Sequence, residues 1–279
     1  MPDELHDKYE RLLERLRSLG SVVVAFSAGV DSTFLLYAAR EALGDRVIAA
    51  TGLSETYPEE EIEEARQLAR ELGVRHMAIR TEELTDPRYA SNSHQRCFFC
   101  KQELYSKLRA LADAAGFAAV IDGTNADDLA DYRPGLRAAR QFGVYHPLAE
   151  VGLTKREIRE LSRRFGLHTW DKPAYACLSS RFPYGTPITV EKLRQVAAAE
   201  RALRELGFRA FRVRHHDQIA RLELHPEDFL RALELRDEIV TRLRAVGYEF
   251  ITLDLEGYRS GSFNRTLPDA LKVGSTGRS

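Results

Sequence analysis

The sequence predicts an α/β protein with a doubly wound parallel sheet, followed by a smaller C-terminal α+β domain. Short apolar runs alternate with amphipathic segments at helical spacing along the N-terminal part of the chain, as in βαβ units. The first run, residues 22–26, is bounded by Gly20 and by a turn of small residues at 27–29, which is typical of a buried parallel strand. Nearer the C-terminus, two strand patterns follow each other directly, as in a hairpin.

The expected N-terminal elements follow from this alternation. Residues 4–19 place leucines at helical spacing between charges, which predicts a packing helix to which we assign no function. Thr154 and Glu157 fit a capping box at a later helix start. The expected helices span residues 4–19, 31–43, 59–72, 97–116 and 154–165, and the expected strands span 22–26, 46–51, 74–79 and 117–121.

The C-terminal part predicts a separate module. Three prolines and a glycine between residues 170 and 187 predict a constrained loop rather than a helix. The expected order after this loop is helix 189–206, strands 210–214 and 219–224, helix 226–246 and strand 250–255. We therefore expect a first domain at 1–172, a connecting loop at 173–187, a second domain at 188–262, and a loosely ordered tail at 263–279.

Composition restricts the class of protein. The 279 residues are 44% hydrophobic and 30% charged, which suits a soluble globular protein, and the net charge is -1. A near-neutral chain has no global attraction to nucleic acid or to anionic membranes. The N-terminus is too charged for a signal peptide and no apolar run is long enough to span a membrane. We expect a cytoplasmic protein without a nucleic-acid or membrane partner.

The turn after the first strand predicts an anion-binding cradle. Ser27, Gly29 and Ser32 leave room for a phosphate to contact backbone N–H groups, and the helix beginning near Asp31 directs its partial positive end there. Ligands of doubly wound sheets lie beyond the carboxyl ends of the strands. A glycine-containing turn without a ligand is the alternative, because such a turn alone is a weak signal.

An acidic loop follows the strand at 117–121. Asp127 and Asp128 carry the carboxylate oxygens that Mg²⁺ prefers, and Arg133 could contact a phosphate. Helix capping explains the two aspartates equally, and a loop salt bridge explains the arginine.

Cysteines and arginines form two further candidate groups. Cys97, Cys100 and Cys177 are the three cysteines of the chain, and a Cys-x-x-Cys pair at a helix start indicates metal or redox chemistry. Two buried apolar residues are the simpler reading of that pair. Arg212 and Arg214 project from one strand face and can grip a phosphate or carboxylate, unless that face is merely solvated.

The cradle resembles a known nucleotide-binding signature. The run from Ser27 to Ser32, SAGVDS, is similar to the SGGxDS motif of the PP-loop ATP pyrophosphatases, which split ATP between its α and β phosphates. Ala28 replaces a glycine of that motif, which the loop tolerates unless position 28 needs a positive φ. The loop at 123–128 is similar to their GTNxDD loop. The resemblance implies an adenine nucleotide alpha hydrolase-like fold, ATP and Mg²⁺, a catalytic Asp31, and a set of nucleotide and pyrophosphate contacts: Ser27, Gly29, Val30, Asp31, Ser32, Thr51, Thr124, Asn125 and Asp128.

Three C-terminal stretches narrow the resemblance. Residues 176–185, 212–216 and 254–262 resemble the LarE family of ATP-dependent sulfur transferases, which build the nickel-pincer nucleotide cofactor of lactate racemase. The family implies that a carboxylate of pyridinium-3,5-biscarboxylic acid mononucleotide is adenylylated and then converted to a thiocarboxylate. The family also implies four contacts to the substrate's phosphate or carboxylate: Ser180, Arg181, Arg212 and Arg214.

The resemblance implies two sulfur sources. In one branch the cysteine matching Cys177 gives up its own sulfur, so that each chain turns over once. In the other, three cysteines hold a [4Fe-4S] cluster that carries an exchangeable hydrosulfide, which Cys97, Cys100 and Cys177 fit. We favour the cluster, which requires the loop at 177 to return to the start of the helix at 97; a Zn²⁺ site is a third reading. A sulfide donor and a homo-oligomer complete the expectation.

Two other enzyme classes remain open at this stage. A tRNA thiolase of the TtcA type also joins a PP-loop to cysteines, but the near-neutral charge and the lack of an RNA-binding module disfavour it. An ammonia-using ligase such as NAD synthetase gives the three cysteines no role. A nucleotide sensor without enzyme activity is the remaining alternative.

Overall fold

The computed structural model describes residues 2–57, 59–130, 134–173 and 177–259. Within these ranges the chain forms two compact units, the first from residues 2–83 and 97–173 and the second from 84–96 and 177–259. Residues 84–96 therefore pack with the second unit although the sequence assigned them to the first domain. The tail at 263–279 and Arg133 lie outside the described residues.

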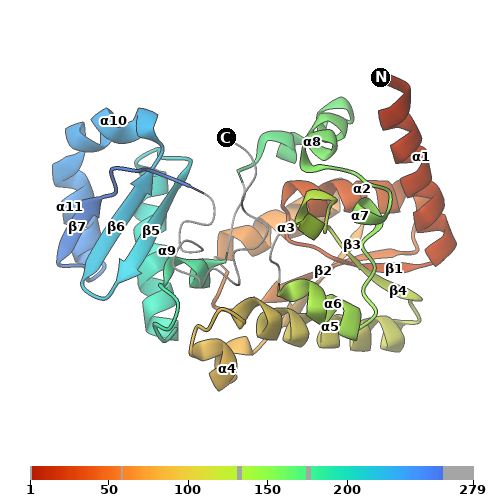
Figure 1. Ribbon diagram of the computed structural model, residues 1–279, viewed down its shortest axis with the longest axis horizontal. Coiled ribbons are helices and arrows are strands. Elements are labelled where there is room, and N and C mark those ends of the chain that lie inside the picture. Colours follow the sequence, from red (N-terminus) through yellow and green to blue (C-terminus); the bar gives the residue numbers. More distant parts are fainter. Residues whose placement is uncertain (1, 58, 131–133, 174–176, 260–279) are drawn as a thin grey trace. The chain divides into compact units, whose positions relative to one another are not determined.

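The first unit is built on a parallel four-stranded sheet in the order β3-β2-β1-β4 (Figure 1). Val22 of β1 pairs with Val47 of β2 on one side and with Ala119 of β4 on the other. The strand order thus changes direction at β1, so a ligand is expected beyond the carboxyl ends of β1 and β4. The strands are β1 Val22–Ala25, β2 Val47–Leu53, β3 Arg75–Arg80 and β4 Ala119–Asp122.

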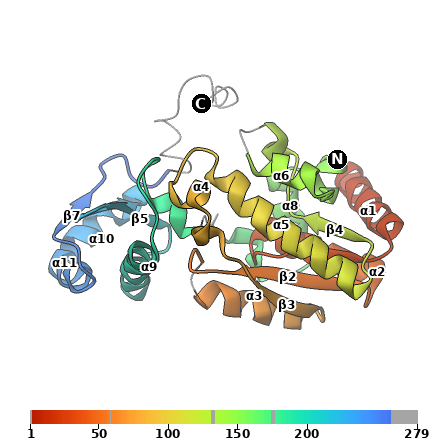
Figure 2. The same cartoon turned by 90° about the horizontal axis from the view of Figure 1, so that it is seen from below.

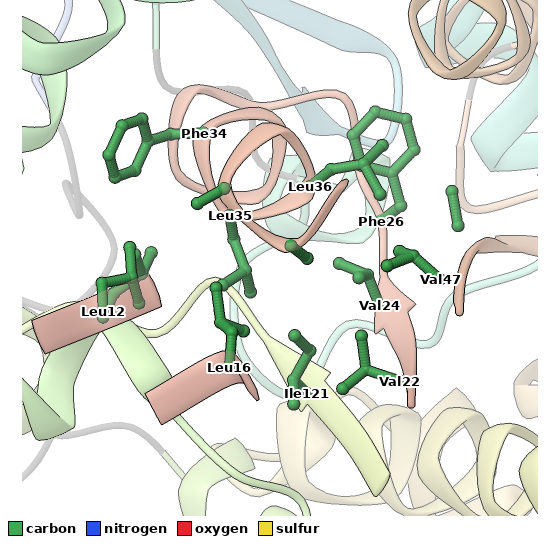
Figure 3. Packing of buried hydrophobic residues seen from close by; sticks show 14 of the residues in the cluster. Leu12, Leu16, Val22, Val24, Phe26, Phe34, Leu35, Leu36, Val47 and Ile121 are labelled. Atoms are coloured by element: carbon green, nitrogen blue, oxygen red, sulfur yellow. The ribbon is translucent and has the colours of Figure 1, made fainter. Parts of the chain in front are cut away.

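Helices cover both faces of this sheet (Figures 1 and 2). Val22 and Val24 point to the face covered by α1, α2, α3 and α8, where Figure 3 shows them in one cluster with Leu16. The intervening Val23 faces α5 and α6. Buried side chains on both faces explain why β1 is apolar at every position. The helices of the first unit are α1 Pro2–Leu19, α2 Val30–Leu43, α3 Glu59–Glu71, α5 Arg96–Ala115, α6 Gly135–Gln141, α7 Pro147–Glu150 and α8 Lys155–Arg164.

The second unit has a three-stranded sheet in the order β5-β6-β7. β5 and β6 form an antiparallel hairpin, and β7 joins β6 in parallel. One face is apolar and packs on helices, as Val213 and Leu222 do on Leu203. The elements are α4 Pro87–Ala90, α9 Val190–Glu205, β5 Phe211–His216, β6 Ile219–Leu224, α10 Phe229–Glu234, α11 Arg236–Ala245 and β7 Phe250–Leu253.

The predicted fold class is confirmed, with one wrong element. A parallel sheet wound on both faces and a hairpin-based C-terminal module are both present. The single helix expected over 226–246 is instead a 3-10 turn at Pro226–Asp228 followed by α10 and α11, which separate at Leu235. No proline or glycine marks that break, so tertiary packing rather than local sequence sets it.

Short 3-10 turns complete the described chain. They lie at Glu83–Thr85, Asp127–Ala130, His168–Asp171 and Leu178–Arg181. Two of them fall in the region expected to be a constrained loop, which contains no α-helix in its described residues. None of the described helices has the length and apolarity needed to cross a bilayer.

Candidate functional site

The turn between β1 and α2 leaves helix N–H groups available to a ligand. Gly29 is the N-cap of α2 and provides no side-chain cap, and the first intrahelical bond runs from the Thr33 N–H to the Gly29 carbonyl at 2.9 Å. The N–H groups of the first turn lie at the positive end of a 14-residue helix. This geometry suits the anion cradle that the sequence predicts, and the binding of a phosphate there stays a prediction.

Two serine hydroxyls hold the cradle in shape. The Oγ atoms of Ser27 and Ser32 lie 3.1 Å apart. The Ser32 Oγ also accepts from the Ser27 N–H at 3.3 Å and lies 3.2 Å from the Gly29 carbonyl, to which it can donate. The contacts between the two serines therefore hold the two ends of the turn together.

Position 28 does adopt a left-handed conformation. Ala28 has φ 54° and is fully buried. A glycine would hold this conformation without strain, whereas an alanine pays about 1 kcal/mol or more. The departure from the SGGxDS pattern is therefore accommodated with some strain inside the cradle.

The end of β4 approaches the cradle closely. A Cβ atom added at Gly123 would lie 2.9 Å from the Ser32 backbone nitrogen and 3.2 Å from the Asp31 carbonyl carbon. No such crowding exists at Gly29, where a Cβ would meet only the Ser27 Oγ at 3.5 Å. Gly123 is thus needed for the packing of β4 against α2, while Gly29 leaves open space where a ligand is expected.

Two lysines that sequence reasoning missed lie at the cradle. Lys155, the first residue of α8, places its Nζ 2.5 Å from the Asp31 carboxylate. The Lys172 Nζ donates to the Ala28 carbonyl at 3.1 Å and pairs with Glu64 of α3 at 2.7 Å. Both come from elements more than 120 residues after the cradle in sequence. They bring ammonium groups to the cradle, each of which is also paired with a carboxylate, Asp31 or Glu64.

The Asp31 carboxylate fits a metal ion. One oxygen binds Lys155, while the Oδ1 atom is buried and has no hydrogen-bond partner. A buried carboxylate oxygen without a donor costs free energy, which a hard cation bound with its phosphate ligand would recover. The donor type and the position beside the α2 N-terminus therefore suit Mg²⁺.

The acidic loop after β4 is ordered by its own backbone. The Asn125 Oδ1 accepts from the N–H groups of Asp127 at 3.0 Å and Asp128 at 3.2 Å, and the Asp128 Oδ2 accepts from the Asn125 N–H at 3.2 Å. The Asp127 carboxylate accepts from the backbone N–H of Lys155 at 2.8 Å. These are capping contacts, so the helix-cap reading of the two aspartates has direct support.

A buried polar group lies directly beneath that loop. The Asp122 carboxylate accepts from the Tyr105 hydroxyl at 2.5 Å, from the Thr124 N–H at 3.0 Å, and lies 2.7 Å from the His146 Nδ1. Burial alone would raise the pKa of Asp122, but the bond and charge of His146 outweigh it and hold that pKa well below its usual range. Burial alone would lower the pKa of His146, yet Asp122 raises it. The pair fixes the start of the loop through Thr124.

The Thr51 side chain connects neighbouring strands of the sheet. Its Oγ1 donates to the Phe26 carbonyl at 2.8 Å and lies 2.9 Å from the His76 Nε2. Burial lowers the pKa of His76, so a neutral imidazole donates to Thr51. The predicted nucleotide contact through Thr51 stays a prediction, and its hydroxyl is engaged in tying β2 to the end of β1.

A buried carboxylate organises the segment after β2. The Glu83 Oε1 accepts from the Ser54 hydroxyl at 2.7 Å and from the Thr56 hydroxyl at 2.9 Å. Glu83 and Thr56 are both buried, and no sequence pattern singled them out. Hydrogen bonds to Glu83 therefore fix the segment that follows β2 and borders the cradle.

In the second unit the predicted arginines form buried contacts. Arg181 is fully buried and pairs with Glu200 through Nε at 2.7 Å and Nη2 at 2.8 Å, while its Nη1 donates to the Cys177 carbonyl at 3.2 Å. Burial alone would raise the pKa of Glu200, but Arg181 keeps it below its ordinary value. This pair supports the backbone of the cysteine loop.

The other two arginines share one face of the hairpin, as predicted. The Arg214 guanidinium pairs with Glu223 at 2.7 Å and donates to the Ser180 carbonyl at 2.7 Å. Arg212 lies over the Tyr258 ring, 4.9 Å from its centroid, and burial lowers its pKa. Their contact with a substrate stays a prediction, and the solvated-face reading is wrong because both side chains are buried.

The three cysteines are divided between the units. Cys97 and Cys100 lie one turn apart at the start of α5, and Cys177 precedes the 3-10 turn at Leu178–Arg181. All three are thiols; Cys97 is exposed and the other two are partly buried. Within the described residues, no three His, Cys, Asp or Glu side chains gather as a metal site. Sharing of one ligand by the three thiols stays a prediction.

Comparisons with known proteins agree on one group. The family model described as asparagine synthase matches residues 9–221. A pyridinium-3,5-bisthiocarboxylic acid mononucleotide synthase of Lactiplantibacillus plantarum is 40% identical over 95% of this chain and 97% of its own length. An uncharacterized protein of Synechocystis sp. is 46% identical over 94% of this chain and 99% of its own, and one of Methanocaldococcus jannaschii is 31% identical over 61% and 66%.

Proposed function

The chain belongs to the LarE family of PP-loop ATP pyrophosphatases, and we propose that it converts a carboxylate of pyridinium-3,5-biscarboxylic acid mononucleotide to a thiocarboxylate. It is an ATP-dependent sulfur transferase of nickel-pincer nucleotide cofactor biosynthesis. The observation that supports this most directly is the α2 N-terminus, which lacks a side-chain cap and lies beside Lys155 and Lys172. This helix N-terminus is a local site for a polyphosphate, although the net charge of the whole chain is only -1.

The first step is an adenylylation. A carboxylate oxygen of the substrate attacks the α phosphorus of ATP, the bond from that phosphorus to the bridging oxygen breaks, and pyrophosphate leaves. The N–H groups at the start of α2, with the two lysines, stabilise the charge that gathers on pyrophosphate. Mg²⁺ bound through Asp31 would offset the same charge. Four residues beyond the cradle are proposed to line the nucleotide: Thr51, Thr124, Asn125 and Asp128.

The second step exchanges AMP for sulfur. A sulfur nucleophile attacks the acyl carbon of the mixed anhydride, and AMP leaves with the electron pair of the broken C–O bond. We propose that Ser180, Arg212 and Arg214 hold the phosphate or carboxylate of the substrate, with Arg181 supporting the loop that carries Ser180. This division rests on burial, because the Arg181 side chain is completely buried against Glu200, whereas Arg214, which also pairs with a glutamate, keeps a small exposed part.

We propose that Cys97, Cys100 and Cys177 hold a [4Fe-4S] cluster. Three thiols are the donor set that leaves one iron open, and the three here are not in disulfides. The cluster would supply exchangeable sulfide, which a sulfide donor renews. If Cys177 gives up its own sulfur instead, mass spectrometry after turnover will find dehydroalanine at position 177. Intact Cys177 after several product molecules per chain supports the cluster.

The domain boundaries and assembly belong to the same proposal. Residues 1–172 would bind ATP, 173–187 would connect, and 188–262 would hold the substrate and contribute to a homo-oligomer. We further propose that the enzyme acts in the cytoplasm, where a low redox potential keeps three thiols reduced.

Substitution of Asp31 tests the ATP site. Asp31→Ala is expected to lower substrate-dependent AMP release by at least about 100-fold, because it removes the proposed Mg²⁺ ligand and the partner of Lys155. The fold should persist, since the lost carboxylate includes a buried oxygen without a donor. AMP release would be followed by liquid chromatography and folding by circular dichroism. Undiminished AMP release from a folded variant would show that ATP binds elsewhere.

A further inference from the structure

A buried carboxylate lies at the carboxyl end of β4, one residue before Gly123. Asp122 is the last residue of that strand and is 6% exposed. It accepts from the Tyr105 hydroxyl at 2.5 Å and lies 2.7 Å from the His146 Nδ1. Tyr105, Asp122 and His146 are here called the β4 anchor. All three belong to the first unit, and they come from α5, from β4 and from the chain just before α7.

Backbone contacts join His146 to the edge of β4. Tyr145 forms a parallel bridge with Ile121. The Asp122 N–H donates to the Tyr145 carbonyl at 3.1 Å, and the Tyr145 N–H donates to the Val120 carbonyl at 3.0 Å. The edge of the sheet therefore places the imidazole beside Asp122.

The residues that follow the β4 anchor contact the cradle. The Asp122 carboxylate accepts from the Thr124 N–H at 3.0 Å and so closes a turn around Gly123. A Cβ atom at Gly123 would lie 2.9 Å from the Ser32 backbone nitrogen, so the end of β4 lies directly against the first turn of α2. A displacement of Asp122 would therefore move the nucleotide loop and disturb the start of α2.

The protonation states of the anchor residues suit this role. Burial and the Asp122 carboxylate raise the pKa of Tyr105 well above its ordinary value, so the hydroxyl remains a donor. Burial alone would lower the pKa of His146, yet Asp122 raises it, so the imidazolium persists to higher pH than in an ordinary histidine. A charged donor binds a carboxylate more strongly than a neutral donor does. The anchor is therefore tightest when His146 is protonated.

Other elements also bring charge near His146. Lys101 of α5 opposes the proton on His146, whereas Glu150 of α7 favours it. Glu150 accepts from the His146 N–H at 3.1 Å and from Arg15 of α1 at 2.5 Å. The 3-10 turn that packs on α7 carries two more carboxylates: Asp127 and Asp128. The bond between Nδ1 and Asp122 is the contact through which the proton acts on the loop.

We propose that the β4 anchor positions the nucleotide loop for ATP: it holds Gly123 against the start of α2, so that the helix N-terminus and the loop contact the polyphosphate together. Protonation of His146 strengthens this hold and favours ATP binding. The three anchor residues are positioning residues, because they act through Gly123 and Thr124 rather than by contact with the nucleotide. This inference rests on the proposed ATP-dependent function and deepens it.

Binding of an ATP analogue tests the anchor without requiring catalysis. The α,β-methylene analogue of ATP resists cleavage between its α and β phosphates, and isothermal titration calorimetry with Mg²⁺ measures its dissociation constant. Tyr105→Phe and His146→Gln should each bind the analogue at least about fivefold more weakly than wild type at about pH 6. The matched control is Tyr9→Phe, which removes the hydroxyl of another buried tyrosine that donates to a carboxylate, Glu41, at 2.7 Å. This control should bind the analogue like wild type.

The pH profile separates positioning from packing. His146 is protonated below the ordinary histidine pKa of about 6.5 and loses the proton as pH rises through its higher pKa in the folded protein. The dissociation constant of His146→Gln divided by that of wild type should therefore be largest near about pH 6 and fall about threefold or more toward about pH 9. Taking this ratio at each pH removes the titration of the analogue and of the groups that both proteins share. A ratio that stays constant with pH would overturn the role given to the proton.

The outcomes separate this inference from the function on which it rests. If wild type does not bind the analogue, the proposed function fails together with the inference. If wild type binds it and the folded Tyr105→Phe and His146→Gln variants bind equally well, the anchor does not position the loop and the inference is wrong, while the ATP site stands. An equal loss of binding in Tyr9→Phe would also overturn the inference. Should His146→Gln not fold, Tyr105→Phe, which keeps its ring, decides the question.

Discussion

Gly123 carries a constraint that its neighbours in the acidic loop do not. Its Cα faces the backbone of Asp31 and Ser32 so closely that any side chain would collide with them. The sequence motif marks Gly123 as part of a nucleotide loop, but the close approach of β4 to α2 gives it a packing role as well. Glycine is the one residue that lets the end of β4 lie against the cradle at this distance.

A pair of glycine substitutions separates packing from binding. Gly123→Ala should lower the free energy of unfolding by about 1–3 kcal/mol and weaken ATP binding, because the new methyl displaces the start of α2. Gly29→Ala, whose methyl meets only the Ser27 Oγ, should change stability by less than about 1 kcal/mol. Urea unfolding measures both. Equal stability of the two variants would contradict the close approach.

At the residue scale, the motif residues of the cradle could be predicted from the sequence, whereas the residues that contact them could not. Ser27, Gly29 and Ser32 are recognisable because a phosphate cradle needs small residues at adjacent positions. Lys155 and Lys172 reach the cradle from distant elements and belong to no local pattern, so only the fold could reveal them. The left-handed φ of Ala28 was indicated only by the glycine of the SGGxDS motif, because alanine itself gives no local signal for it.

The His146–Asp122 pair gives a pH dependence at the residue scale. Asp122 raises the pKa of His146 in the folded protein, so the folded state binds that proton more tightly than the unfolded state. The contribution is complete below the ordinary histidine pKa of about 6.5 and is lost as pH rises from there through the folded pKa. Wild type should lose stability relative to His146→Gln over this range.

Denaturant unfolding of both proteins between about pH 6 and pH 9 measures the difference. Subtracting the variant removes the contributions of His76, His215 and His216, whose pKa values are lowered and whose slopes have the opposite sign. One proton limits the slope to about 1.4 kcal/mol per pH unit. A difference that stays constant with pH would contradict the raised pKa.

At the scale of elements, α8 delivers charge to the cradle through its capping box. The Thr154 Oγ1 accepts from the Glu157 N–H at 3.3 Å, and the Glu157 carboxylate accepts from the Thr154 N–H at 2.9 Å. Burial alone would raise the pKa of Glu157, but Lys8 and Thr154 lower it. The capping box could be predicted from a threonine and a glutamate three residues apart. Its effect on the position of Lys155 could not be predicted.

Removal of the cap should therefore affect ATP more than a surface change does. Thr154→Ala is expected to lower the free energy of unfolding by about 1 kcal/mol and to raise the KM for ATP, because Lys155 is the first residue of the helix that the cap fixes. Thr189→Ala, a cap of α9 in the other unit, should show a similar stability loss with an unchanged KM. A matching KM shift in both variants would contradict the link to Lys155.

At the scale of the whole molecule, the sequence predicted the architecture better than the path of the chain. Strand and helix periodicities over 22–121 predicted the parallel sheet because β1 is apolar at every position and β2 and β4 begin with buried apolar residues. The passage of residues 84–96 into the second unit was not predictable, since it depends on buried polar contacts such as that of Tyr89 with Ser179 across 90 residues. Local patterns cannot report partners so distant in sequence.

The packing of residues 84–96 in the second unit bears on how sulfur transfer should respond to the substitution of a cysteine. Cys97 and Cys177 lie far apart in sequence, yet Arg96, the residue before Cys97, donates to the carbonyl of Ser179, two residues after Cys177. If the three thiols hold one cluster, Cys97→Ser should retain ATP cleavage but lose multiple turnover with added sulfide, yielding at most about one product per chain. Sacrifice of Cys177 instead predicts one product per chain for wild type and variant alike.

Anaerobic preparation with iron and sulfide counting, followed by quantification of thiocarboxylate per chain, distinguishes these outcomes. Cys97→Ser that continues to cycle on sulfide would contradict the cluster, because a pair of remaining thiols would then suffice. Loss of AMP release in the same variant would contradict the separation of the two steps, since Cys97 has no role in the cradle of α2. The prediction thus links the number of turnovers to Cys97, which has no proposed role in ATP binding. Damage to the ATP site would instead lower AMP release.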